Sequence, residues 1–437
     1  MRICFIIHQA SKEGAGRFLL DQIDYLKKKN VVVYVIVPTL GPLCEALSQR
    51  EVEFKIVENP WWTKGSFTSS TAGRAFMLVA ACAMADLFLK WKIDIIYTQT
   101  IVAPAGALAS AMIGKPHIWH IHEFSYNPEC IEMAIPQLEL AQLLNLTSNW
   151  IVFNSSAVAA EWRDWLPPAK MKIVRNWLNP KTISENETVV SGFRPAGNNP
   201  FKIAMVASIL PWKRQMDAVQ ATAKLIRENL DVCLSVVGPL INEKYRDDII
   251  AFIDEHKLQD RIHLLGYMEN PESVVKSSQA TVVCSRLEPF GRVTIESMAQ
   301  GVPVVGANSG GTREIIEDEV NGLLYPVGDI DALANQLSRL VQDENFRQKL
   351  SKNAIRCAEQ FSSAEKEMEP LLALLSAIRG TPNPSWPLGE MLGAHMSAEL
   401  KNSRNLSAHE HINLLFGKLK RRIKNLITAK SQANVVR

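Results

Sequence analysis

The chain has 437 residues, of which 47% are hydrophobic, and a formal net charge of +3; a length of about three typical domains predicts two domains and an additional segment. Seven basic residues and no acidic ones lie beyond residue 410, and without their charges the rest of the chain carries −4. A mildly acidic body is a poor nucleic-acid binder, so any attraction to an anionic surface is expected from this basic tail alone.

Strands and helices alternate through the first half of the chain. Continuous apolar runs such as RICFII are typical of strands buried on both faces, and they predict strands at 2–7, 31–37, 93–99, 117–122 and 150–155. Residues 16–29 have helical spacing, with the apolar side chains on one side. The apolar run 75–85 is too short to cross a bilayer and predicts a buried helix. This βαβ repetition predicts a parallel sheet with helices on both faces.

A polar stretch rich in Gly, Pro and Asn interrupts the pattern at 186–200 and predicts a domain boundary. The alternation then restarts, with strands expected at 201–207, 232–238, 262–266, 280–285 and 303–307, and helices at 213–228, 243–256, from Arg292, and near 364–378. We therefore expect an α/β fold of two doubly wound, Rossmann-like domains, residues 1–190 and 191–378, followed by a linker and basic tail at 379–437. Open α/β sheets bind ligands at the carboxyl ends of their strands, so two such domains facing each other predict a cleft.

The seven cysteines are scattered and include no Cys-x-x-Cys pair. Their spacing argues against a disulfide framework or a zinc site and fits a reducing cytoplasm. The opening residues MRICFII are too short for the apolar core of a signal peptide, so a cytoplasmic protein is expected.

The stretch EPFGRVTIESMAQGVPVV places two acids, Glu288 and Glu296, around the predicted start of a helix. Free N–H groups at a helix N-terminus attract an anion such as a diphosphate. Carboxylates there would repel that anion but can accept hydrogen bonds from sugar hydroxyls. Glu296 could thus hold a ribose and Glu288 a transferred sugar; the alternative is a surface helix with two solvated acids. The N–H groups expected to meet the diphosphate belong to Phe290, Gly291, Arg292, Val293 and Thr294.

This pattern resembles the signature of retaining GT-B glycosyltransferases of glycosyltransferase family 4, and the resemblance covers about residues 1–378. It implies a nucleotide-diphosphate sugar as co-substrate, with Glu296 at the ribose and Glu288, with the backbone amides after it, at the donor sugar. Arg292 stands where an apolar residue is frequent, so its guanidinium could reach either the diphosphate or the acceptor.

SILPWKRQMDAV, residues 208–219, resembles the family's phosphate-binding stretch, and makes Lys213 a candidate for balancing the leaving diphosphate. The alternative is an ordinary solvated surface lysine. Many relatives carry Arg where this chain has Ser208. The absence of that arginine puts in doubt a clamp of two cations on the diphosphate, unless Arg214 or Arg292 takes its place.

Three further stretches resemble donor-site segments. In WHIHEF, His122 rather than His120 matches a strand-end histidine near the donor sugar, although a histidine in a strand is often structural. Gly14 and Gly16 form a turn that would let the backbone approach the substrate closely. HLLGYMEN places Tyr267 near the nucleotide base, while GANSGGTRE at 306–314 is expected to be a structural turn beside the site.

Two signals are discounted. The DID sequence at 329–331 looks like a metal-binding motif, but Asp329 fits better as the N-cap of a helix, so no metal is expected. The paired tryptophans of NPWWTKG could stack on an acceptor sugar, although core packing is the more usual role.

We therefore expect a retaining, metal-independent glycosyltransferase without a further cofactor, acting on a glycan, a polysaccharide precursor or a lipid-linked sugar. Three alternatives remain: an inactive GT-B scaffold that serves as a binding module, a GT-B epimerase, and a nicotinamide-dependent oxidoreductase. The last lacks the third glycine after Gly16 and an acid after the second predicted strand.

Apolar residues recur at helical spacing in the tail at 412–430, with basic residues between them. Such a helix can lie in the headgroup plane of anionic lipid, which would place the enzyme at the inner face of a membrane. The alternatives are that the tail packs on the first domain or has no fixed structure.

Overall fold

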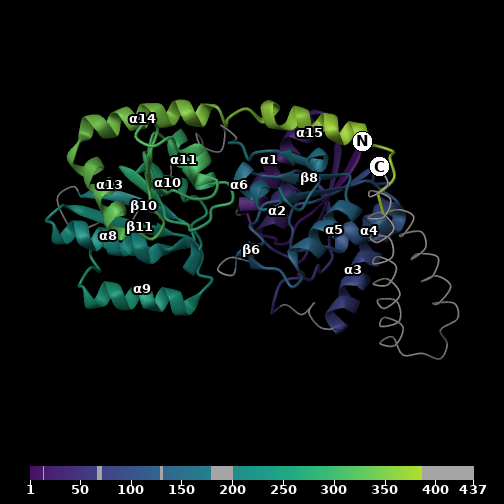
Figure 1. Ribbon diagram of the computed structural model, residues 1–437, viewed down its shortest axis with the longest axis horizontal. Helices are drawn as coiled ribbons and strands as arrows, with labels where there is room; N and C mark the ends of the chain where they lie inside the picture. Colours follow the sequence, from purple (N-terminus) through teal and green to yellow (C-terminus); the bar gives the residue numbers. More distant parts are fainter. Residues whose placement is uncertain (13, 66–70, 128–130, 179–199, 386–437) are drawn as a thin grey trace.

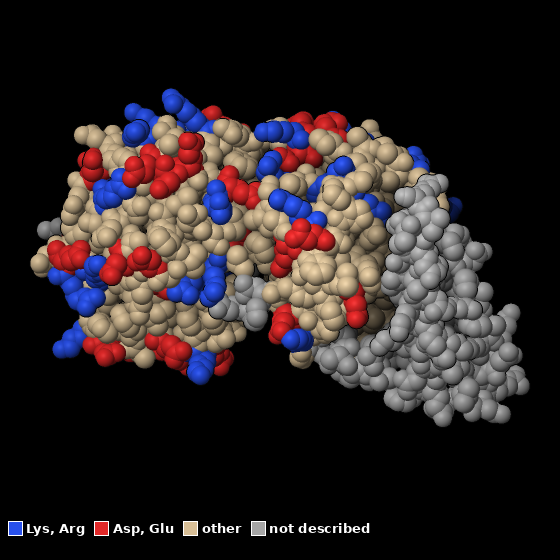
Figure 2. Space-filling model, in the orientation of Figure 1, with Lys and Arg blue, Asp and Glu red and all other residues tan. Residues whose placement is uncertain are grey.

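The computed structural model describes the whole chain except residues 13, 66–70, 128–130, 179–199 and 386–437. Two α/β lobes lie side by side, with the N-terminal lobe on the right and the C-terminal lobe on the left of Figure 1. On the face drawn in Figure 2, acidic and basic side chains are interspersed over both lobes, and a notch separates the lobes at their lower edge.

The N-terminal lobe is built on a seven-stranded parallel sheet of order β3-β2-β1-β4-β5-β8-β9. Its strands are β1 (Arg2–Ile6), β2 (Val32–Val37), β3 (Glu53–Ile56), β4 (Ile95–Thr98), β5 (His117–Ile121), β8 (Trp150–Phe153) and β9 (Met171–Ile173). Its helices are α1 (Gly14–Lys28), α2 (Pro42–Gln49), α3 (Thr71–Lys90), α4 (Ala105–Ile113), α5 (Gln137–Thr147), α6 (Ser156–Ala160) and the 3-10 turn η2 (Pro168–Lys170). A small antiparallel pair, β6 (Tyr126–Asn127) and β7 (Ile131–Glu132), lies apart from the sheet.

The C-terminal lobe repeats this plan with a six-stranded parallel sheet of order β12-β11-β10-β13-β14-β15. Its strands are β10 (Phe201–Val206), β11 (Val232–Val237), β12 (Ile262–Gly266), β13 (Ala280–Val283), β14 (Val304–Ala307) and β15 (Leu323–Tyr325). Its helices are η3 (Pro211–Lys213), α8 (Gln215–Arg227), α9 (Glu243–Glu255), α10 (Glu272–Lys276), α11 (Arg292–Ala299), α12 (Thr312–Ile315), α13 (Ile330–Gln342) and α14 (Glu344–Glu359), followed by α15 (Ala364–Ile378). Two parallel Rossmann-like sheets are the architecture predicted from the sequence; the predicted tail and the boundary at 190–191 lie outside the described residues.

Strand β1 shows why these runs are apolar throughout. Ile3 and Phe5 pack in one core cluster together with α1, whereas Cys4 and Ile6 pack in a second cluster together with α3 and α4. Successive side chains of a strand point to opposite faces, so a strand covered on both sides needs apolar residues at every position. The helix expected at 75–85 forms part of α3. Among the described residues, none of the helices is both long and apolar enough to cross a membrane.

The chain returns to the N-terminal lobe at its last described helix. Met368, Leu371 and Leu375 of α15 are buried in the core that contains β1 and α1. Tyr25 on α1 also donates a hydrogen bond to Glu369 at 2.7 Å. Figure 1 shows α14 over the C-terminal lobe and α15 over the N-terminal one, so α15, which falls in the sequence span 191–378, packs on the other lobe.

This packing predicts that a substitution far along the chain destabilises the N-terminal sheet. Leu371→Ala should cost about 2–5 kcal/mol of unfolding free energy because it opens a cavity in that core. Hydrogen exchange should then show lost protection at β1 and β2. Leu350→Ala is the matched control, because Leu350 is fully buried in the C-terminal core and should affect β10 and β11 instead. Lost protection in the C-terminal sheet of Leu371→Ala would contradict the assignment.

Candidate active site at the interdomain junction

The loop between β13 and α11 is fixed by close backbone packing. Gly291 precedes the helix in the left-handed region with φ 97°, which glycine adopts without strain. A Cβ atom at Gly310 would lie 2.3 Å from the carbonyl oxygen of Glu288, and one at Gly311 would lie 2.4 Å from that of Phe290. Gly311 N also donates to Glu288 O at 2.7 Å. The stretch GANSGGTRE is therefore the structural turn that the sequence predicted.

The N-terminus of α11 supplies free backbone donors. Thr294 N donates to Gly291 O at 3.0 Å, the first bond of the turn. The N–H groups of Arg292 and Val293 precede that bond, and such groups at a helix start have no partner within the helix. Together with the helix dipole they make this end of α11 suited to an anion.

The same loop meets the N-terminal lobe. Ser155 Oγ donates to Pro289 O at 2.5 Å. Glu314 Oε2 of the C-terminal lobe accepts from Ser156 N at 3.1 Å, and Glu314 also accepts from Ala157 N. A carboxylate at the start of α6 satisfies donors that the helix leaves unpaired, so this contact joins the lobes beside the candidate site.

Lys213 and Glu288, which the sequence placed in one site, are in direct contact. Lys213 Nζ donates to Glu288 Oε2 at 2.7 Å, although the two residues are 75 positions apart. Their side chains are 22% and 17% exposed, so both remain accessible while water is partly excluded. This excludes the view of Lys213 as an ordinary solvated surface lysine.

Arg292 contacts neither Lys213 nor Glu288 but joins the two lobes. Its Nε donates to Glu296 Oε1 at 2.7 Å, and its Nη2 donates to Asp21 Oδ2 on α1 at 3.0 Å. Arg17, also on α1, donates to Glu272 of α10 and lies 3.8 Å from Glu296 Oε1. The Glu296 expected at the ribose is therefore surrounded by guanidinium groups from both lobes.

The cations considered as replacements for the arginine missing at Ser208 are engaged elsewhere. Arg214 Nε donates to Asp217 Oδ2 at 2.6 Å, and Arg292 is held as described. Within the described part of the chain, Lys213 is the cation that contacts Glu288.

His122 lies just beyond β5 in a buried aromatic group. Its ring centroid is 4.0 Å from that of His120 and 5.6 Å from that of Phe18. Burial lowers the pKa of His122 to about 3, so the ring is neutral at physiological pH. His122 Nε2 is buried without a hydrogen-bond partner, whereas Nδ1 of His120 lies 3.0 Å from the hydroxyl of Tyr97. His120 Nε2 is likewise buried without a hydrogen-bond partner, so the choice of His122 over His120 as a ligand contact stays a prediction.

Glu123, next in the chain, ties three strand ends together. Its carboxylate accepts from Thr100 Oγ1 at 2.7 Å, from Ile101 N at 3.2 Å and from His122 N at 3.0 Å. His8, which follows β1, has Nδ1 3.8 Å from Glu123 Oε1. Burial raises the pKa of Glu123 to about 7, against the lowering effect of its hydrogen bonds.

The remaining candidates occupy positions consistent with a backbone or surface role. Gly14 and Gly16 open α1, and a Cβ atom at Gly16 would lie 2.0 Å from Ser11 O. Tyr267 follows β12 and is exposed. Phe290 is buried in the core of the C-terminal lobe, so only its backbone is available to a ligand.

Both discounted signals have structural roles. Asp329 Oδ1 accepts from Ala332 N at 2.9 Å and caps α13 as predicted, while Asp331 pairs with Lys224. Trp62 is buried, and its Nε1 donates to Ile101 O at 2.6 Å. Trp61 is partly buried and meets the ring of His8 edge-on.

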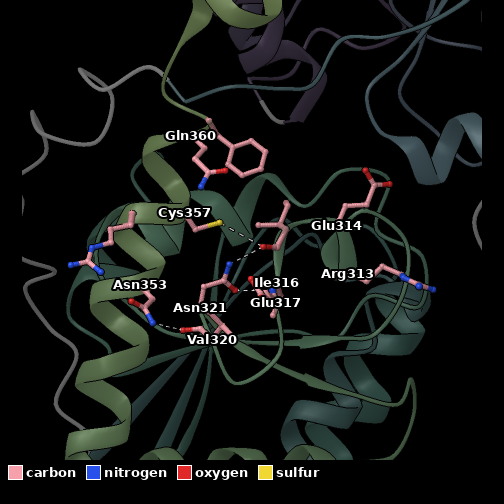
Figure 3. Close-up of a pocket in the computed structure, with 12 residues that line it drawn as sticks. Arg313, Glu314, Ile316, Glu317, Val320, Asn321, Asn353, Cys357 and Gln360 are labelled. Atoms are coloured by element: carbon pink, nitrogen blue, oxygen red, sulfur yellow. Dashed lines mark hydrogen bonds between the residues drawn. The ribbon is translucent and has the colours of Figure 1, made fainter.

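A pocket of about 560 Å³ lies in the C-terminal lobe between α12, the loop after it and α14 (Figure 3). Its polar groups bond to one another: Asn353 Nδ2 donates to Val320 O at 2.8 Å, and Asn321 Nδ2 donates to Ile315 O at 3.1 Å. Neither the glutamate pair nor Lys213 lines it. The candidate site is thus the junction itself and not this pocket.

Comparisons with known proteins match both lobes to glycosyltransferase families. Residues 192–356 match the family described as Glycosyl transferases group 1, and residues 12–182 match Glycosyltransferase Family 4. An N-acetyl-alpha-D-glucosaminyl L-malate synthase of Bacillus anthracis is 34% identical over 297 residues, which are 65% of this chain and 75% of that protein. The chain belongs to glycosyltransferase family 4. As a member, it is a retaining, metal-independent GT-B enzyme that transfers a sugar from a nucleotide-sugar donor.

Two further relatives extend over most of the chain. The UDP-Gal:alpha-D-GlcNAc-diphosphoundecaprenol alpha-1,3-galactosyltransferase of Escherichia coli is 22% identical over 368 residues, 78% of this chain and 89% of that protein. The structure of Anabaena HepE in complex with UDP-glucose aligns with a TM-score of 0.71 at 23% identity, covering 86% of this chain and 100% of that one. The glycosyltransferase fold is therefore shared beyond the range of close sequence similarity.

Several residues of this candidate site were missed from the sequence. Arg17, Asp21 and Glu272 have no local pattern that marks them, although Arg17 directly follows the Gly14-x-Gly16 turn. Glu123 follows His122 in the stretch WHIHEF but was not singled out. Their roles arise from contacts between segments far apart in the chain.

The raised pKa of Glu123 predicts a pH dependence of stability. Its ordinary value of 4.5 rises to about 7 in the folded chain, so its stabilising contribution is complete below pH 4.5 and is lost as the pH rises through 7. Replacing Glu123 by Gln should remove this loss. The unfolding free energy of the natural chain, relative to Glu123→Gln, should therefore fall between about pH 5 and about pH 8 in urea titrations.

The comparison isolates one group. His8 and His122 have lowered pKa values because they are buried, and they titrate in both proteins, so their effects cancel in the difference. An unfolding free-energy difference that is constant over this range, or that rises with pH, would contradict the account of Glu123.

Proposed function

We propose that the enzyme transfers a hexose from a UDP-sugar to an acceptor hydroxyl on a glycan, a polysaccharide precursor or a lipid-linked sugar. The contact of Lys213 with Glu288 beside the N-terminus of α11 carries the proposal, because it joins a cation, a carboxylate and free N–H groups in one place. UDP as the nucleotide is supported by the complex of Anabaena HepE with UDP-glucose, and a lipid-linked acceptor by the named activity of the Escherichia coli relative.

In this proposal the C-terminal lobe binds the donor. Glu296 accepts hydrogen bonds from the ribose hydroxyls, since its Oε1 faces Arg292 while the described residues give its Oε2 no hydrogen bond. The diphosphate lies against the N–H groups of Arg292 and Val293, where the helix dipole favours negative charge. Tyr267 lies near the base, and Gly14 and Gly16 bring the backbone of the N-terminal lobe close to the donor.

The chemistry then depends on position and charge. Glu288 binds hydroxyls of the transferred sugar, and Lys213 Nζ, 2.7 Å from it, balances charge that develops on the leaving diphosphate. The acceptor hydroxyl approaches on the face that the diphosphate leaves, and the diphosphate takes its proton, so the anomeric configuration is retained. His122 offers its unpartnered Nε2 to the sugar.

A second candidate, an inactive scaffold that only binds the nucleotide sugar, would require a broken site. The intact contact between Lys213 and Glu288 and the family membership favour catalysis. Slow donor hydrolysis by the purified protein, measured as release of UDP, separates the two functions: an active enzyme releases UDP, and a binding module does not.

The ribose assignment predicts a specific loss of affinity. Glu296→Ala should weaken the binding of UDP by about 1–3 kcal/mol, the usual range for hydrogen bonds to a charged group. Isothermal titration calorimetry measures it directly. Glu243→Ala removes an exposed acid from the first turn of α9 and should leave the affinity unchanged. Equal affinities for the natural chain and Glu296→Ala would refute the assignment.

Metal independence is testable in the same assay. Transfer should continue at an unchanged rate in excess chelator, because Lys213 and the N–H groups of α11 supply the positive charge at the diphosphate. A strict requirement for added magnesium or manganese would contradict this and would make Asp329 and Asp331 candidate metal ligands.

We also propose that the enzyme is cytoplasmic and that residues 412–430 place it on the inner face of a membrane. The comparison is between the full chain and one ending after Ser385, which keeps the buried Asn383 in contact with Ser110 on α4. Only the full chain should co-sediment with anionic vesicles, and added salt should release it. Equal partitioning of the two chains, or none at low salt, would rule out a membrane role for the tail.

A further inference from the structure

A chain of ionic contacts crosses the junction at the proposed ribose carboxylate. Asp21 of the N-terminal lobe binds Nη2 of Arg292 at 3.0 Å, and Nε of the same guanidinium binds Glu296 Oε1 at 2.7 Å. The side chains of Asp21 and Arg292 are 7% and 11% exposed. These contacts are therefore well removed from solvent and weakly screened.

The position of Arg292 explains why it needs two acids. It is the first residue of α11, where the helix dipole is positive and a cation is unfavourable. A buried guanidinium also requires partners for its charge. Glu296 lies one turn along the same helix, and Asp21 approaches from the other lobe, so the two acids hold the planar guanidinium from different sides.

We infer that Asp21 is a positioning residue for donor recognition: through Arg292 it holds Glu296 with one carboxylate oxygen free for the ribose. Without the charge of Asp21, the guanidinium could turn to a bidentate contact with both oxygens of Glu296, and the ribose would have to compete for them. The donor site of the C-terminal lobe thus depends on contact with the N-terminal lobe. This inference rests on the proposed ribose role of Glu296.

The same helix provides a matched control. Asp24 lies three residues after Asp21 on α1, but it accepts from Nε and Nη2 of Arg50 at 2.9 and 3.1 Å within the N-terminal lobe. Replacing Asp24 removes a carboxylate from α1 without touching the junction. Asp21→Asn and Asp24→Asn therefore each remove one negative charge from α1. Only Asp21→Asn removes a contact of Arg292, the residue that holds Glu296.

The experiment is a double-mutant cycle read by UDP affinity in isothermal titration calorimetry. Asp21→Asn should weaken UDP binding by roughly 5- to 30-fold, in the range of coupling between linked sites, and Asp24→Asn by less than about twofold. In a chain that already carries Glu296→Gln, adding Asp21→Asn should have no further effect, because the residue acts through that carboxylate. KM for the donor should rise in Asp21→Asn while kcat at saturating donor stays near its natural value.

The outcomes separate this inference from the proposed function. If Glu296→Gln binds UDP as well as the natural chain does, the ribose role of Glu296 fails. If Glu296→Gln weakens binding but Asp21→Asn does not, or if their losses add in the double variant, the positioning role of Asp21 is wrong and the ribose assignment stands. Should Asp21→Asn fold poorly in thermal unfolding, Arg292→Lys replaces it in the cycle, because lysine keeps the charge but lacks the fork that joins both acids.

Discussion

Charge pairing within the C-terminal lobe and between the two lobes is the constraint on which the candidate site depends. Glu288 meets Lys213, Glu296 and Asp21 meet Arg292, and Glu272 meets Arg17. The pair of Asp21 and Arg292 is buried, and removing one partner of such a pair leaves an uncompensated charge at a cost of several kcal/mol. The two acids that we propose to bind sugar hydroxyls, Glu288 and Glu296, are therefore oriented by the protein, which would lower the entropic cost of binding the donor.

The path of the chain, which crosses between the lobes and returns, also ties the two lobes to each other. Leu178 N donates to Phe361 O at 2.8 Å where the chain crosses between the lobes, and α15 then packs in the N-terminal core. Two further hydrogen bonds join the lobes beside α11. Glu314 accepts from the backbone N–H at the start of α6, and Ser155 donates to the carbonyl oxygen of Pro289. Any rotation of one lobe against the other must change these contacts together with the pair of Asp21 and Arg292. These contacts can thus fix the position of an acceptor bound to one lobe relative to a donor bound to the other.

Local pattern predicted most of the fold and singled out Lys213 and Glu288, which the structure brings into contact. Central strands were recognisable because both faces are buried, and the start of α11 was recognisable because Gly291 precedes it. The edge strands β3, β9 and β15 were missed, because Glu53–Ile56 is half polar and the others have three residues each. Contacts such as Asp21 with Arg292, 271 positions apart, leave no local signal, so the role of Arg292 needed the tertiary structure. The same holds for Glu123, whose pKa is raised by a burial that only the tertiary structure creates.

A crystal structure with UDP bound tests the account most directly, because it locates every ligand contact at once. We predict the ribose on the free oxygen of Glu296, the diphosphate between Lys213 and the N–H groups that open α11, and Arg292 still in contact with Asp21. A ribose held by other groups, or a diphosphate away from the start of α11, would contradict the account.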